Sequence, residues 1–160
     1  MTDSAVDVRA RGQLYTPAER ARRDASTWTL IQGILAPLQF VVFLVSLALV
    51  VRFLTTGLGE VAANVSIIVK TLTLYAIMIT GSIWEKEVYG KWLFAEPFWW
   101  EDFFSMFVIA LHSAYLVALV AQLGTPEQRM VIALAAYATY AINAAQFLLK
   151  LRAARLEAAA

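Results

Sequence analysis

Four long stretches of the 160-residue chain are almost free of charged side chains. They cover about residues 29–53, 61–84, 103–123 and 129–149. A helix needs about 20 consecutive apolar residues to cross a bilayer, where water cannot hydrogen-bond its backbone. Only 16% of the residues are charged and 61% are hydrophobic, against about a quarter and about half in soluble domains. The sequence therefore predicts an all-α integral membrane bundle of about four transmembrane helices.

The polar residues divide the chain around this bundle. Residues 1–27 are expected to form a cytoplasmic N-terminal tail with a surface helix, and the first apolar run begins too late for a cleavable signal peptide. Residues 28–150 form the transmembrane domain, with a cytoplasmic segment at 85–102. Residues 151–160 form a cytoplasmic C-terminal tail.

Two short motifs predict helix starts. Thr16-Pro17-Ala18-Glu19 is a capping box with proline at the first helical position, and this helix could run on into the first span. Thr125-Pro126-Glu127-Gln128 repeats the pattern before the fourth span, and Gly124 is expected to end the third.

Lysine and arginine placement predicts the orientation, because these residues collect on the cytoplasmic side. With both termini inside, ten fall inside and two outside. The inside set is Arg9, Arg11, Arg20, Arg22, Arg23, Lys86, Lys91, Lys150, Arg152 and Arg155, and the outside set is Arg52 and Arg129.

Composition excludes several kinds of site. The chain has no cysteine, so disulfides, iron–sulfur clusters and thiolate sites are excluded. One histidine cannot ligate a bis-histidine haem within one chain. The net charge of +1 gives no electrostatic basis for binding nucleic acid, which leaves membrane lipid as the expected environment.

Carboxylates and tryptophans are concentrated between Trp84 and Asp102. Such residues gather at any membrane interface, which is the simplest interpretation. However, Glu85 and the pair Glu101–Asp102 stand at the inner ends of successive spans and are expected to face each other. A carboxyl group beside partly dehydrated aromatic surface can serve as a general acid near neutral pH.

Ionisable residues also fall inside two spans. His112 shares a predicted helix face with Glu101, Ser105 and Tyr115, and Lys70 lies at comparable depth in the second span. Ionisable groups at such depth usually mark function, although a histidine can simply bond a neighbouring helix and a lysine can extend to the interface. Gln39 adds a polar group in the first span.

Several strings resemble the 3-vinyl bacteriochlorophyllide hydratases, across nearly the whole chain. They are residues 14–24, 28–33, 36–40, 83–86, 100–106 and 110–119. The resemblance implies a hydro-lyase of bacteriochlorophyll biosynthesis that adds water across the C3 vinyl group of a chlorophyllide or bacteriochlorophyllide, giving a 1-hydroxyethyl group. It also implies a bacterial inner (intracytoplasmic) membrane and no cofactor, since the Mg²⁺ belongs to the substrate.

The chemistry suggests roles for particular residues. Glu101 or Glu85 is the expected proton donor, with Asp102 orienting water or holding the geometry of the donor. His112 could serve as water base or as axial ligand of the pigment Mg²⁺. Candidate substrate-binding residues are Trp84, Lys86, Trp99, Trp100, Tyr115, Lys70 and Gln39, with Lys86 or Lys91 pairing the pigment propionate.

Two other functions fit the same residues. A non-catalytic pigment-binding or assembly protein would need the tryptophans and His112 but not the carboxylates, so carboxylate substitutions separate it from an enzyme. A small proton or ion carrier would depend on Lys70 and His112. Small residues in the fourth span also permit a homo-oligomer, or contact with other pathway enzymes.

Overall fold

The computed structural model describes residue 9 and residues 12–159, and every regular element among them is helical. A short helix α1 (Pro17–Ala25) precedes the long helices α2 (Thr27–Thr56) and α3 (Glu60–Tyr89). A single 3-10 turn, η1 (Glu96–Phe98), leads into α4 (Trp99–Val120), and α5 (Pro126–Ala159) completes the described chain.

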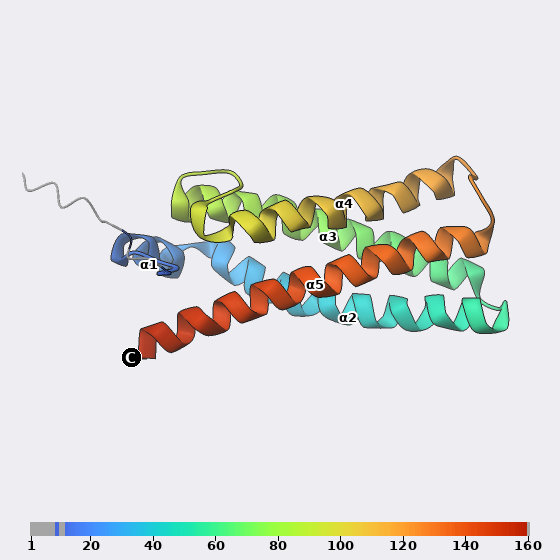
Figure 1. Cartoon of the computed structure of the whole chain (residues 1–160), viewed down its shortest axis with the longest axis horizontal. Helices are drawn as coiled ribbons and strands as arrows, with labels where there is room; N and C mark the ends of the chain where they lie inside the picture. The colour runs from blue at the N-terminus through green and yellow to red at the C-terminus, as the bar shows by residue number, and fades with distance from the viewer. Residues whose placement is uncertain (1–8, 10–11, 160) are drawn as a thin grey trace, which may run out of the picture.

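The long helices form an antiparallel bundle of two hairpins. Helix α2 packs mainly on α3, and α4 mainly on α5 (Figure 1). Helix α1, the connection between α3 and α4, and the C-terminal end of α5 gather at one end of the bundle, while the other two turns lie at the opposite end. We call the first of these the α1 end.

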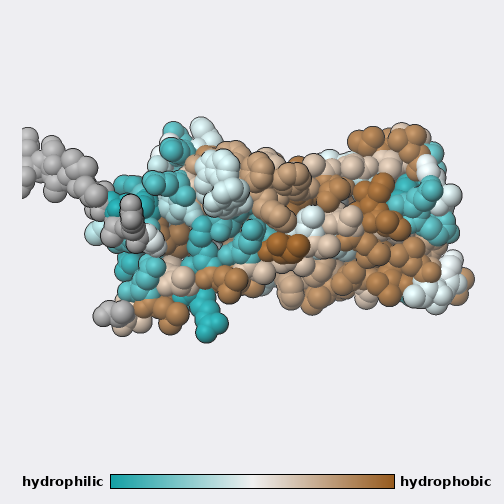
Figure 2. Space-filling model, viewed as in Figure 1, coloured by the Kyte–Doolittle hydropathy of each residue, from teal (hydrophilic) through white to brown (hydrophobic). Residues whose placement is uncertain are grey.

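All four long helices are apolar enough to cross a membrane. Large apolar side chains such as Leu30, Val61, Val120 and Leu148 point outward and are more than half exposed. Helices that are apolar all round are typical of a bilayer environment. Figure 2 shows the consequence, a broad hydrophobic band with hydrophilic residues gathered mainly at the α1 end. The regular structure of the described residues is therefore all-helical, with four helices long and apolar enough to cross a membrane.

The capping box at Thr16 is confirmed. The Glu19 amide donates to Thr16 Oγ1 at 3.3 Å, and the Thr16 amide donates to Glu19 Oε2 at 2.8 Å. Helix α1 does not continue into α2, because Ser26 leaves the helical conformation and its Oγ accepts from the Trp28 amide at 3.2 Å. Ser26 therefore separates the surface helix from the first span.

The second capping motif is also confirmed, but the end predicted for the preceding helix is wrong. The Gln128 amide donates to Thr125 Oγ1 at 3.2 Å, and the Thr125 amide donates to Gln128 Oε1 at 2.9 Å. Helix α4 ends at Val120 rather than at Gly124. Gln122 takes the left-handed position (φ 53°), and the Leu123 amide donates to the Ala118 carbonyl at 2.9 Å, which closes the helix earlier.

Candidate functional site

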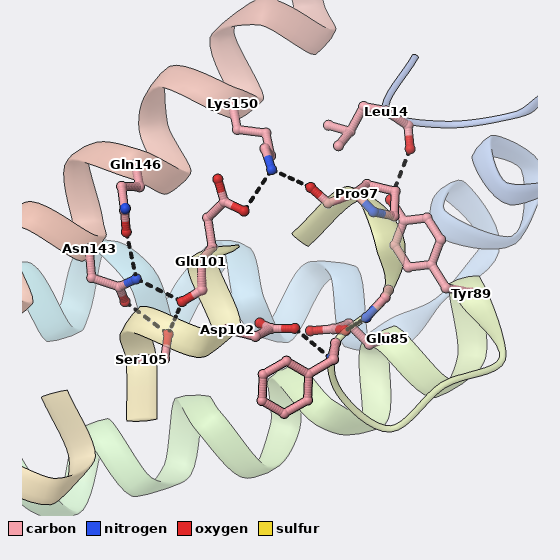
Figure 3. A network of polar contacts seen from close by, with 12 residues as sticks. Leu14, Glu85, Tyr89, Pro97, Glu101, Asp102, Ser105, Asn143, Gln146 and Lys150 are labelled. Atoms are coloured by element: carbon pink, nitrogen blue, oxygen red, sulfur yellow. Dashed lines mark hydrogen bonds and ion pairs between the residues drawn. The ribbon is translucent and has the colours of Figure 1, made fainter. Parts of the chain in front are cut away.

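Two buried carboxyl groups meet at the α1 end. Helix α3 supplies Glu85 from its last turns, and α4 supplies Asp102 from its first turn; they are 5% and 3% exposed. Figure 3 shows the two carboxyl groups next to each other, and each acts electrostatically on the other. Two buried carboxylates repel each other at such close range, so the arrangement favours a proton on one of the two groups. We call Glu85 and Asp102 the carboxyl pair.

Backbone amides hold the outer oxygens of the carboxyl pair. The Ala95 amide donates to Glu85 Oε2 at 3.1 Å, and the Phe94 amide donates to Asp102 Oδ2 at 2.8 Å. Phe94 adopts a left-handed conformation (φ 59°), which is uncommon for a bulky side chain. The connection between α3 and α4 therefore folds back over the pair and fixes the orientation of both groups.

Glu101 has a different partner from its neighbour Asp102. Its Oε2 lies 2.6 Å from Lys150 Nζ of α5, which also donates to the Pro97 carbonyl. The Glu101 carbonyl accepts from Ser105 Oγ at 2.8 Å and from Asn143 Nδ2 at 3.0 Å. These contacts tie α4 to α5 and give Glu101 a cationic partner (Figure 3).

An exposed aromatic surface lies on the outer side of α4, beside the carboxyl pair. Trp99 stacks on Phe103 with ring centroids 5.5 Å apart, Trp100 packs edge-on against Trp99 at 4.9 Å, and Phe107 packs edge-on against Phe103 at 5.5 Å. All four rings are at least 40% exposed. Because Trp99 and Phe103 flank Asp102 in the first turns of α4, this surface borders the pair.

The other predicted interfacial residues are arranged differently. Trp84 points into a cluster with Tyr89 and Phe98, and its Nε1 donates to Thr29 Oγ1 at 2.9 Å. Lys86 and Lys91 are exposed, and Lys86 Nζ donates to the Gly90 carbonyl at 2.9 Å. Trp84 is therefore a packing contact in this conformation, and the two lysines are accessible.

The remaining predicted residues lie deeper in the bundle. Gln39, Lys70, His112 and Tyr115 are each at most 3% exposed. His112 is ten residues beyond Asp102, or about 15 Å along α4 at 1.5 Å per residue. Tyr115 lies further on and donates to Asn64 Oδ1 at 2.5 Å. The structure thus brings Glu85, Glu101 and Asp102 together and separates them from His112 and Lys70.

The segment before α1 closes the α1 end, which the sequence did not indicate. Leu14 and Tyr15 are buried, Tyr15 stacks on Tyr89 at 5.9 Å, and Tyr89 Oη donates to the Leu14 carbonyl at 3.2 Å. Burial raises the pKa of the Tyr15 phenol, against the opposing effect of the Arg23 guanidinium 4.5 Å from its ring centre. Tyr15 therefore serves as a neutral packing residue.

Metal-ligand clusters are not part of this site. Within the described residues, no group of three or more histidine, aspartate or glutamate side chains is placed to hold a metal ion. The carboxyl pair, its amide donors and the aromatic surface together form a site suited to proton transfer beside a flat, apolar molecule.

Comparison with known proteins identifies relatives along almost the whole chain. The family described as 2-vinyl bacteriochlorophyllide hydratase matches residues 15–153. A protein of that name from Rhodobacter capsulatus is 66% identical over 151 residues, covering 94% of this chain and 87% of the relative. Another of that name, from Cereibacter sphaeroides, is 63% identical over 146 residues, covering 91% and 90%. No solved structure matches the chain.

Proposed function

The chain belongs to the 2-vinyl bacteriochlorophyllide hydratase family and is a hydro-lyase of bacteriochlorophyll biosynthesis; on that premise, we propose that its carboxyl pair delivers the proton that starts the reaction. Numbering systems for tetrapyrroles call the carbon that bears this vinyl group either 2 or 3. The observation that carries the proposal is that the Glu85 and Asp102 carboxyl groups are buried side by side, which favours keeping one transferable proton at the α1 end.

The first step is proton transfer to the terminal vinyl carbon. The proton leaves the carboxyl pair, the carbon–carbon π bond supplies the electrons, and the positive charge appears on the inner carbon, where the macrocycle delocalises it. The pair is left with two negative charges. The Ala95 and Phe94 amides lower the free energy of the doubly charged pair, because each already donates to one carboxyl oxygen.

Water attack completes the reaction. The water oxygen bonds to the inner carbon, its proton returns to the carboxyl pair, and the product carries a 1-hydroxyethyl group. The carboxyl pair first donates a proton and then accepts one, and a single positioned water supplies the remaining atoms, so atoms and charge balance. No cofactor is required, and the Mg²⁺ stays within the substrate.

Glu101 is the second candidate for the proton donor. Its side chain is already engaged in an ion pair with Lys150, whereas Glu85 and Asp102 are two buried carboxyl groups side by side, an arrangement that favours one shared proton. We therefore assign proton transfer to the pair and give Glu101 the task of holding α5 against the start of α4.

The substrate is placed on the exposed aromatic surface. A chlorin is flat and apolar, and the Trp99 and Phe103 rings lie within 9° of parallel, so they offer a face on which the macrocycle can stack at the membrane boundary. Lys86 in the last turn of α3 or Lys91 in the connection that follows it, both exposed, would pair with the propionate. Axial ligation by His112 would require the helices to separate, because His112 is fully buried.

The site is assigned to the cytoplasmic face of a bacterial inner (intracytoplasmic) membrane. The lysine and arginine distribution supports this orientation, as does the gathering of α1, the α3–α4 connection and the end of α5 at one end of the bundle (Figure 1). Water and the charged propionate group of the pigment can both reach the site from that side.

Isotope labelling tests the proposed chemistry. Purified protein in nanodiscs is incubated with a vinyl chlorophyllide, once in H₂¹⁸O and once in D₂O, and the products are analysed by mass spectrometry and NMR. We expect ¹⁸O on the carbon attached to the macrocycle and one deuterium in the adjacent methyl group. Oxygen on the terminal carbon, or oxygen that does not come from water, would rule out this sequence of steps.

A further inference from the structure

Three buried polar atoms in the middle of the bundle have no hydrogen-bond partner among residues 9 and 12–159. They are Gln39 Oε1, Lys70 Nζ and His112 Nε2. Their side chains come from α2, α3 and α4, and are 3%, 0% and 0% exposed. An unpartnered polar group costs free energy when it is buried, so three of them in one bundle call for an explanation.

The three residues lie at one level of the bundle. Between α2 and α3, Gln32 donates to Thr80 Oγ1 at 2.6 Å, and Ser46 contacts Ser66 at 2.7 Å. Gln39 is midway between Gln32 and Ser46, so in this antiparallel pair it lies opposite residue 73, less than one turn from Lys70.

His112 shares this level. Tyr75 Oη lies 2.5 Å from Ser113 Oγ, which places His112 beside Tyr75 of α3. Lys70 is five residues, about 7.5 Å, from Tyr75 along α3, and its long side chain extends to the Tyr140 ring.

A continuous aromatic wall joins the three residues. Lys70 Nζ lies 3.6 Å from the centre of the Tyr140 ring, and Tyr140 packs on Phe43 at 5.0 Å. Phe43 packs on Tyr137 at 5.4 Å, and Tyr137 packs on His112 at 5.7 Å. Phe43 also follows Gln39 by one helical turn, which puts both on the same face of α2. The unpartnered atoms therefore belong to side chains gathered around one buried aromatic cluster to which all four long helices contribute.

The hydrogen-bonding capacities of the three atoms are complementary. Lysine can only donate as an ammonium, and an amide oxygen can only accept. His112 Nδ1 donates to the Val108 carbonyl at 2.7 Å, which leaves Nε2 of the neutral ring as an acceptor. The three side chains thus present one cationic donor and two acceptors.

We propose that Gln39, Lys70 and His112 form a binding site for buried water inside the membrane-spanning bundle. Water can accept from Lys70 Nζ and can donate to Gln39 Oε1 and His112 Nε2, and about three hydrogen bonds are usual for a buried water. An anion would meet two acceptors here, and a metal ion would meet the lysine ammonium. Water is the small molecule that satisfies all three atoms together.

This site is distinct from the proposed catalytic centre. It lies about 15 Å from Asp102 along α4, and neither Glu85 nor Glu101 contributes to it. The water site can therefore be tested independently of the proton-transfer mechanism.

Radiolytic hydroxyl-radical labelling of the full chain in nanodiscs tests the site, because bound water generates radicals next to the side chains that it touches. We expect Tyr137 and Tyr140 to be oxidised several-fold faster than Phe53, which is similarly buried (2%, 7% and 5% exposed) but lies far from the three atoms. Equal, low labelling of all three aromatics would overturn the proposal.

Variants make the test specific. Gln39→Leu and Lys70→Met should each lower the labelling of Tyr140 toward that of Phe53, with helix content checked by circular dichroism. Thr73→Val is the matched control, since Thr73 bonds only the Lys70 carbonyl and the three polar atoms stay in place. If one variant fails to fold, the other decides, and unchanged Tyr140 labelling in a folded variant contradicts the water site.

Discussion

Replacing Glu85 by glutamine removes the transferable proton of the carboxyl pair with little change of shape. The glutamine carbonyl oxygen can still accept from the Ala95 amide, which donates to Glu85 at 3.1 Å, and its amide nitrogen can donate to Asp102. The side chain stays buried and hydrogen-bonded, so we expect the Glu85→Gln protein to fold and insert normally.

The expected loss of activity follows from the role of the proton. General acid catalysis contributes about 10²- to 10⁴-fold to a rate. We therefore expect kcat to fall by about 10²- to 10⁴-fold, which corresponds to about 3–5 kcal/mol in the activation free energy. KM should change little, because Glu85 is only 5% exposed and the proposed stacking surface on α4 is untouched.

The assay is single-turnover conversion of a vinyl chlorophyllide by purified protein, followed by chromatography of the pigments. Glu96→Gln is the matched control, since Glu96 is an exposed carboxylate on the connection between α3 and α4. A Glu85→Gln enzyme that works within a few-fold of the Glu96→Gln enzyme would refute the assignment of the proton to the pair.

Three further perturbations probe the orientation, the ion pair and the aromatic surface. Because the chain has no cysteine, single cysteines at Glu96 and Leu58 should be labelled by impermeant maleimide from the cytoplasmic and the opposite side respectively, and the reverse pattern would invert the topology. Lys150→Met should destabilise the fold by about 1–3 kcal/mol in thermal unfolding, because it leaves the buried Glu101 carboxylate unpaired, and adding Glu101→Gln should restore most of the loss; an unchanged melting temperature would argue against the ion pair. Trp99→Ala should raise KM about tenfold while kcat changes less, whereas Leu123→Ala at the opposite end of the bundle should leave KM unchanged. An equal change of KM in the two variants would argue against substrate stacking on Trp99.

Patterns that depend on neighbouring residues were predictable from the sequence. The apolar stretches indicated the four long helices, and the motifs at Thr16 and Thr125 indicated two helix starts, because a capping box depends on residues three positions apart. The early end of α4 was not predictable, since Gln122 takes a left-handed conformation that favours glycine and Gly124 stood nearby.

The candidate site was predictable only in part, for a physical reason. Positions at the inner ends of successive spans suggested that Glu85 would face Glu101 and Asp102. The sequence could not say which carboxyl would meet Lys150, because that choice depends on the rotation of α4 against α5. The Leu14–Tyr15 contact with Tyr89 joins residues about 75 positions apart, and no local pattern encodes it.

Infrared spectroscopy tests the central claim, that the carboxyl pair holds a proton, most directly. A protonated carboxyl group has a C=O stretching band separate from those of carboxylates and amides. We expect such a band near neutral pH in the native protein. It should be kept in Glu96→Gln and lost in the double variant Glu85→Gln/Asp102→Asn. A native protein without this band, or a double variant that retains it in full, would contradict the claim.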